Sequence, residues 1–143
     1  MKVIVTESRL TKVLHTYLNM TFEGFDNCKY EFAHIFCDEG ICADPYAIGF
    51  FLPQDNEYLF KLVNSEHYDD DGNYPRGFGM NLLKSNKTNP NISNKEFDTI
   101  VVTERLYNNL YSFFGDIDIW RDPLLSIINN VYNTHATSLI YFK

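Results

Sequence analysis

The pattern that decides the fold class is clearest in residues 97–115, FDTIVVTERLYNNLYSFFG. The apolar, β-branched run over residues 97–102 is typical of a strand. Thr103 can then cap a helix, and Glu104 puts a negative charge in its first turn, where the helix dipole favours one. Apolar residues recur at helical spacing over residues 106–114, and a glycine follows them. The stretch predicts a strand that leads into a helix with a wide aromatic face.

The start of the chain carries the same pattern. Residues 2–5 form a short β-branched run, Thr6 is a second candidate N-cap, and residues 7–19 place apolar side chains at helical spacing. The two stretches are either ordinary strand-to-helix junctions or copies of a small duplicated unit. Residues 20–63 have no later counterpart, so we do not expect a full repeat protein.

Strands are predicted between these two helices, over residues 22–63. Over residues 30–37 the aromatic side chains Tyr30, Phe32, His34 and Phe36 alternate with Glu31, Ala33, Ile35 and Cys37. The sequence Asp-Glu-Gly at 38–40 favours a turn. A second apolar run at 47–52 ends at a proline, and period two returns over 58–63. This order of strands and turns predicts an antiparallel meander.

The last part of the chain predicts a third helix and a final strand. We expect residues 116–121 to be a connector, Asp122 to cap the helix and Pro123 to start it, with its end near Asn133. Residues 138–142 can form the strand. The predicted fold is therefore α+β, with a mostly antiparallel or mixed sheet and about three helices packed on it, in a single domain over residues 1–143.

A long polar segment at about 64–95 interrupts this pattern. It is rich in Asn, Asp and Gly, and a loop of this length is uncommon inside a compact domain unless it is functional. Two interpretations remain open. The loop packs on its own domain or on a neighbouring molecule, or partner subunits order it.

Composition excludes several classes of function. The chain has 143 residues, of which 45% are hydrophobic and 16% aromatic, which argues against an intrinsically disordered protein. Its net charge of −7 and its scattered basic residues argue against binding to nucleic acid or to anionic membranes, but they permit basic partners. No signal peptide and no membrane-spanning run is evident. We therefore expect an intracellular chain with reduced cysteines.

Metal-binding motifs are weak. Cys28, His34, Cys37 and Cys42 could together supply zinc ligands, but their spacing does not form the usual paired knuckles, and the cysteines are better interpreted as small core residues. Residues 67–78 place a glycine as an EF-hand loop does, yet His and Phe stand at the two ends where acidic ligands belong. We expect no metal and no cofactor, and a weak calcium contact outside the EF-hand pattern is kept as an alternative.

Catalytic motifs are missing as well. The chain has no nucleophile elbow and no phosphate-binding glycine loop, and nothing favours one of its four histidines over another as a base. We therefore expect a protein that is not an enzyme. A small hydrolase or transferase built on His and Asp residues is kept as an alternative.

Aromatic side chains are the most informative candidates for a functional site. One helix has only one face to bury, so some aromatic residues of a crowded segment are expected at an interface, where aromatics and Arg are enriched. The candidate interface residues are Tyr107, Tyr111, Phe113, Phe114, Trp120, Arg76 and Phe78.

The first ten residues, MKVIVTESRL, resemble the start of many proteins of crAss-like and related Bacteroidetes phages. The shared features are a basic residue, a short aliphatic strand and Thr-Glu-Ser-x-Leu at the entry to a helix. The composition, rich in Asn, Ile, Tyr and Phe, is similar to that of proteins from such AT-rich genomes. The resemblance implies a phage protein, such as a virion component, and it transfers no catalytic residue.

The sequence thus predicts a non-enzymatic structural or assembly component of a tailed-phage virion, such as a ring, tail or capsid-associated subunit. The expected partners are other virion proteins or copies of the chain itself, without direct contact with nucleic acid or membrane, in a virion made in the host cytoplasm. A small acidic adaptor or inhibitor that binds a host protein is the main alternative.

Overall fold

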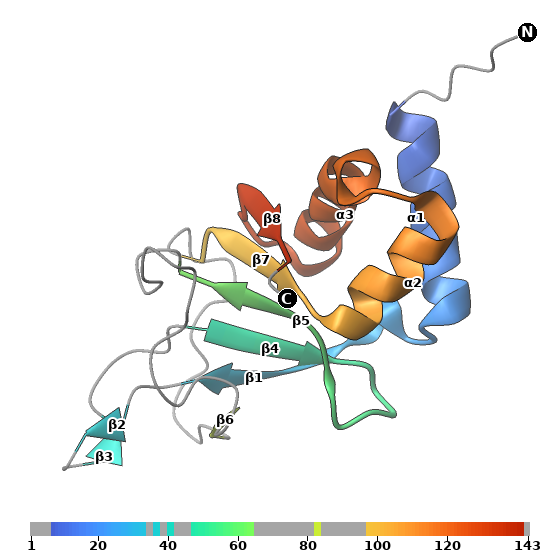
Figure 1. The fold of residues 1–143 in the computed structure, drawn as a ribbon. Helices are drawn as coiled ribbons and strands as arrows, with labels where there is room; N and C mark the ends of the chain where they lie inside the picture. Colours follow the sequence, from blue (N-terminus) through green and yellow to red (C-terminus); the bar gives the residue numbers. More distant parts are fainter. Residues whose placement is uncertain are drawn as a thin grey trace, which may run out of the picture.

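The structure is a computed structural model that describes residues 7–33, 36–37, 40–41, 47–64, 82–83 and 97–141. The strand predicted over residues 2–5 and nearly all of the predicted loop over 64–95 lie outside the described residues. Figure 1 shows the arrangement of the helices and strands. Among the described residues, no helix combines the length and the apolar character that crossing a membrane requires.

A six-stranded mixed sheet forms the centre of the fold. Its strands, in spatial order, are β6 (Leu82–Leu83), β1 (Lys29–Ala33), β4 (Ala47–Phe51), β5 (Tyr58–Val63), β7 (Thr99–Val102) and β8 (Ser138–Ile140). Neighbouring strands are antiparallel except β7 and β8, which are parallel. A separate short ladder pairs β2 (Phe36–Cys37) with β3 (Gly40–Ile41). The predicted α+β fold class is confirmed.

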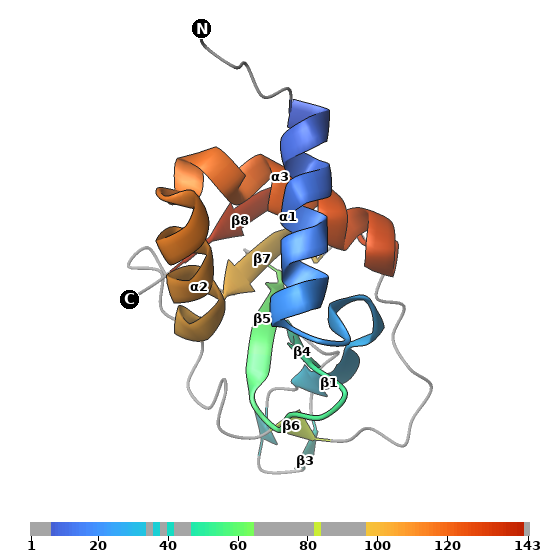
Figure 2. The ribbon, with the colours of Figure 1, turned by 90° about the vertical axis from the view of Figure 1, so that its right-hand side faces the viewer.

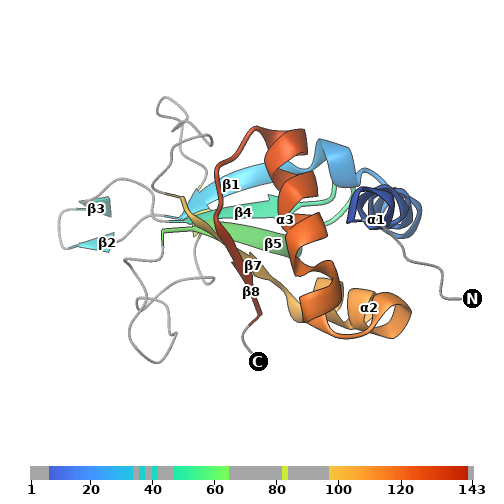
Figure 3. The same cartoon turned by 90° about the horizontal axis from the view of Figure 1, so that it is seen from above.

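Three α-helices pack alongside the sheet: α1 (Glu7–Thr21), α2 (Glu104–Phe114) and α3 (Ile117–Tyr132). Figures 2 and 3 show α1 lying against α3, with α2 beside them. A short 3-10 helix, η1 (Phe25–Asn27), joins α1 to β1. The parallel pair of β7 and β8 requires a crossover connection, and α2 and α3 provide it.

Alternate residues of the central strands form the sheet's contribution to the core. One cross-strand row joins Phe50, Phe60 and Val102, and the next row joins Ile48, Leu62, Ile100 and Leu139. All seven side chains belong to the buried hydrophobic cluster. The period-two pattern expected of strands therefore places one face of the sheet against the helices.

Helix α2 begins and ends where the sequence predicts. The Thr103 hydroxyl accepts a hydrogen bond from the backbone N–H of Leu106 at 3.5 Å and donates one to the Leu59 carbonyl at 2.7 Å. The N-cap thus also attaches the helix to β5. At the other end, Gly115 has a φ of +92°, and its N–H donates to the Tyr111 carbonyl at 2.9 Å.

Helix α3 corrects the predicted boundary. It begins at Ile117 rather than Pro123, and Asp116 is its N-cap, with Oδ1 accepting from the N–H of Asp118 at 3.1 Å. Pro123 lies inside the helix, where it cannot donate to the carbonyl of Ile119. The longer helix includes Trp120 on its buried apolar face.

Tyr132, the last residue of α3, connects the helix layer to the start of the sheet. Its hydroxyl donates to the Phe25 carbonyl and accepts from the backbone N–H of Cys28 at 3.0 Å. Cys28 itself is buried and its thiol donates to the same carbonyl at 3.4 Å, so the core role expected for this cysteine is confirmed. Burial, and then contact with Cys28 and the charge of Asp26, raise the pKa of Tyr132.

Replacing Gly24 by Ala is expected to lower the free energy of unfolding by about 2–4 kcal/mol. Gly24 has a φ of +87°, and an added Cβ would lie 2.7 Å from Cδ of Pro53. Denaturation with urea measures the loss. In a Pro53→Ala background the ring atoms are gone, so the cost should fall to the backbone strain of about 1–2 kcal/mol. An equal cost in both backgrounds would show that the contact with Pro53 does not matter.

Replacing Tyr132 by Phe should lower the free energy of unfolding by about 1–3 kcal/mol at neutral pH, because the Phe25 carbonyl and the Cys28 N–H both lose their hydrogen bond to the phenol, and the N–H loses its partner. This difference in stability between the wild type and Tyr132→Phe should become smaller when the pH rises above 10.0, the ordinary pKa of tyrosine. The unfolded chain then loses the phenol proton while the folded chain retains it, so the wild type loses stability as pH rises.

Urea denaturation at a series of alkaline pH values tests this expectation for Tyr132. Tyr111→Phe is the matched control, since the Tyr111 side chain is exposed and removal of its hydroxyl group should change the stability little at any pH. A deficit for Tyr132→Phe that stays constant from neutral to alkaline pH would contradict the assignment of a raised pKa.

Candidate interaction surface

Helix α2 carries aromatic side chains on both of its flanks. Leu106 and Leu110 point into the core and are fully buried. Tyr107 and Tyr111 lie one turn apart on one flank, while Phe113 projects on the other. Two surfaces with different chemistry result, one on each side of the same helix.

The first surface lies where α2 meets α1. The ring of Tyr17 is 4.4 Å from the ring of Phe113 and 5.3 Å from that of Phe114, centroid to centroid. The Tyr17 hydroxyl donates to the Asn109 carbonyl at 3.3 Å. Although it contacts Tyr17, the Phe113 side chain is 62% exposed. An aromatic ring is therefore held in a fixed position with much of its surface in water.

Helix α1 extends this apolar area. Val13 and Met20 share the face of Tyr17, because the three residues are spaced by four and three positions. Val13 is 49% exposed and Met20 is 80% exposed. We call Val13, Tyr17, Met20 and Phe113 the α1–α2 surface. Single exposed apolar side chains are ordinary, but four that share one area are typical of a contact site.

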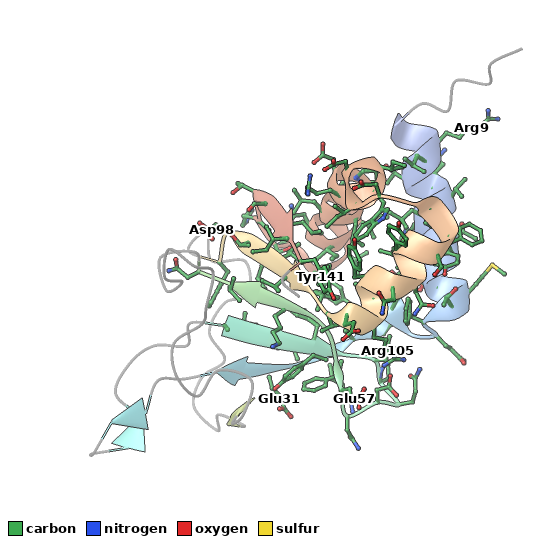
Figure 4. The ribbon with its side chains drawn as sticks, viewed as in Figure 1. Arg9, Glu31, Glu57, Asp98, Arg105 and Tyr141 are labelled. Atoms are coloured by element: carbon green, nitrogen blue, oxygen red, sulfur yellow. The ribbon has the colours of Figure 1, made fainter. Side chains whose placement is uncertain are left out.

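The second surface is a hollow on the opposite flank of α2. It has a volume of about 470 Å³, and it is lined by Glu104, Tyr107, Asn108, Tyr111 and Tyr141. We call it the tyrosine pocket. Tyr141 comes from the segment after β8, and its position against α2 can be followed in Figure 4.

The rings of the tyrosine pocket are held by stacking. Tyr107 and Tyr141 are nearly parallel, with centroids 4.0 Å apart, and Tyr107 and Tyr111 are 5.9 Å apart. Behind them, Trp120 meets Tyr107 edge-on at 5.9 Å. Desolvation, followed by the nearby Glu104 and Tyr107, raises the pKa of Tyr141.

The candidate interface residues from the sequence divide into three groups. Tyr107, Tyr111, Phe113 and Phe114 lie together on α2, as expected, although on two flanks. Trp120 is fully buried and its Nε1 donates to the Gly115 carbonyl at 3.0 Å, so it is a core residue that offers no surface to a partner. Arg76 and Phe78 lie outside the described residues.

The interface residues predicted from the sequence omit six contributors to the two surfaces. Glu104 and Asn108 lie on α2 itself. Of the other four, Val13 and Tyr17 are apolar positions of the helix predicted over 7–19, Met20 follows the predicted end of that helix, and Tyr141 belongs to the strand predicted over 138–142. Nothing local shows that these residues approach α2. The only available signal was the excess of apolar positions on α1, which is more than one buried face needs.

Other candidate chemistry finds little support among the described residues. Within that part of the chain, no group of three or more His, Cys, Asp or Glu side chains could hold a metal ion. His15 is engaged with Asp26, Nε2 to Oδ1, at 2.8 Å. Asp116 caps α3, and Asp118 pairs with Arg121 at 2.6 Å. The zinc candidates His34, Cys37 and Cys42 and the acidic turn over 67–78 lie outside the described side chains.

Comparison with known proteins adds no family assignment. No protein-family model matches the chain, and neither a curated protein nor a solved structure shows significant similarity to it. Function is therefore inferred from the two surfaces of α2.

Proposed function

We propose that the chain is a non-enzymatic structural or assembly protein that binds other protein subunits through the α1–α2 surface. The observation that carries this proposal is the exposure of Phe113 and Met20 beside the fixed ring of Tyr17. Covering such side chains removes apolar area from water, which is the main driving force of protein association. Aromatic residues and Met are also the types enriched in interface centres.

The more specific form of the proposal is a component of a tailed-phage virion, such as a ring, tail or capsid-associated subunit. It is supported by the N-terminal sequence MKVIVTESRL and by the Asn-, Ile-, Tyr- and Phe-rich composition. Its partners would be copies of the chain or other virion proteins. A subunit in a large assembly needs a contact surface on a stable domain and does not need an active site, which suits the arrangement of α1 and α2.

A small acidic adaptor or inhibitor of a host protein is a second candidate. The observation that favours it is the charge, with 19 acidic against 12 basic residues and a net charge of −7. A negative net charge accelerates association with a basic protein, and added salt weakens this acceleration. Salt-sensitive binding to one host protein, without self-association, would favour the adaptor over the assembly protein.

The assembly proposal predicts that the purified protein forms a closed oligomer, or associates as its concentration rises. Phe113→Ser should weaken that association about tenfold or more, since the loss of one aromatic contact at an interface centre commonly costs above 1 kcal/mol. Native mass spectrometry at near-physiological salt, together with sedimentation across a concentration series, measures both effects.

Ile119→Ser provides the matched control for the association experiment. Its side chain is 50% exposed on α3, and it belongs to neither the α1–α2 surface nor the tyrosine pocket. We expect this variant to associate like the wild type. A wild-type protein that stays monomeric at every concentration would refute self-assembly, and equal losses in the two variants would refute the role of the α1–α2 surface.

A further inference from the structure

We propose that the tyrosine pocket binds the guanidinium group of an arginine side chain on a protein partner. This inference rests on the proposed protein-binding function, and it assigns a specific chemistry to the flank of α2 that the α1–α2 surface does not use. The juxtaposition that supports it is three tyrosine rings and one carboxylate around a single hollow.

The aromatic part of the pocket suits a flat cation. Tyr111 is 55% exposed, so a ring face is accessible, and Tyr107 and Tyr141 stand beside it. A cation within about 6 Å of a tyrosine centroid is attracted by the negative face of the ring. Arg adds stacking to this attraction, because its guanidinium is planar and less strongly hydrated than an ammonium group.

The charge of the pocket points to the same ligand. Glu104 is exposed at its edge, and none of the five lining residues is a cation. The adjacent Arg105 points elsewhere and pairs with Asp55, from Nη1 to Oδ2, at 2.7 Å. Among the described residues, Glu104 therefore has no ion-pair partner. A bound guanidinium would supply one, and an anion would be repelled.

The pocket is also organised before any ligand arrives. Tyr107 is fixed between the stacked ring of Tyr141 and the edge of the buried Trp120. Glu104 is held in the first turn of α2, which the Thr103 cap fixes to β5. Preformed sites lose less conformational entropy on binding. A volume of about 470 Å³ exceeds what a bare metal ion requires, and it falls within the usual range of about 300–1,000 Å³ for sites of small molecules.

Binding can be measured on the full-length protein with a simple probe, N-acetyl-arginine amide. The matched neutral probe is N-acetyl-citrulline amide, which has nearly the same shape without the charge. Trp120 is the only tryptophan of the chain and contacts Tyr107, so its fluorescence reports on the pocket. Amide shifts of residues 104–111 in an NMR titration provide a second readout.

We expect the arginine probe to bind about tenfold more tightly than the citrulline probe, as the range of cation–π energies implies. Tyr111→Ala and Glu104→Gln should each weaken arginine binding, and Glu104→Gln should also reduce the preference for arginine over citrulline. The control variants are Ile119→Ala, which is exposed on α3 outside both surfaces, and Glu57→Gln, in the turn between β4 and β5 (Figure 4). Both should bind as the wild type does.

Three results would overturn the inference. The first is equal binding of the two probes, which would indicate a neutral ligand such as a sugar. The second is no binding of the arginine probe. The third is arginine binding that is unchanged in both Tyr111→Ala and Glu104→Gln. Circular dichroism and urea denaturation of each variant establish that it is folded before its binding is compared.

The proposed function can fail separately from this inference. Arginine binding in a protein that never self-associates would support the pocket and refute self-assembly. Self-association that depends on Phe113, without arginine binding, would support self-assembly and refute the pocket.

Discussion

The stacked pair of Phe50 and Phe60 is the contact on which the remaining packing depends. The two rings lie 4.6 Å apart on neighbouring strands at the centre of the sheet, and both are fully buried. Phe25 of η1 packs on one ring at 6.0 Å, and Tyr132 of α3 lies 5.1 Å from the other. The short helix η1, which follows α1, and the end of α3 are thereby packed against the same two residues. Because Tyr132 also binds the backbone on both sides of η1, helix layer and sheet cannot shift independently.

Helix α2 takes its position from this arrangement and leaves part of itself uncovered. Its leucines are buried in the core, and the Thr103 hydroxyl at its start donates a hydrogen bond to a β5 carbonyl. Trp120 donates a hydrogen bond to the Gly115 carbonyl in the connection to α3. A helix of 11 residues in such a place can bury only one stripe, but its sequence has aromatic rings well beyond one stripe. Those rings remain on the flanks, where α1 and the segment after β8 support them without covering them. The candidate surfaces are thus a consequence of packing that is complete for the core and incomplete for α2.

Local signals in the sequence were enough for most of the fold and only part of the candidate site. A cap, an apolar period and a glycine define α2, since each depends on neighbouring residues alone. The sequence predicts the start of α3 too late because Asp122 and Pro123 resemble a helix start, whereas the helix begins at Ile117 and includes the fully buried Trp120. Contacts such as Tyr17 with Phe113, or Tyr107 with Tyr141, join segments far apart in the chain. Periodicity shows which face of a helix is apolar, but it does not show which element that face meets.

The two flanks of α2 have consequences for specificity if both are contact sites. The apolar flank would contribute affinity to any partner that covers Phe113, and it discriminates poorly because apolar burial is not directional. The tyrosine pocket would discriminate between partners, since a partner without a cation at that position offers no opposite charge to Glu104 and no cation to the three rings. One short, well-capped helix carries both flanks, so the spacing between them is fixed by the backbone rather than by flexible side chains. A partner that satisfies both must therefore present an apolar group and an arginine at a defined separation, a stricter requirement than either surface imposes alone.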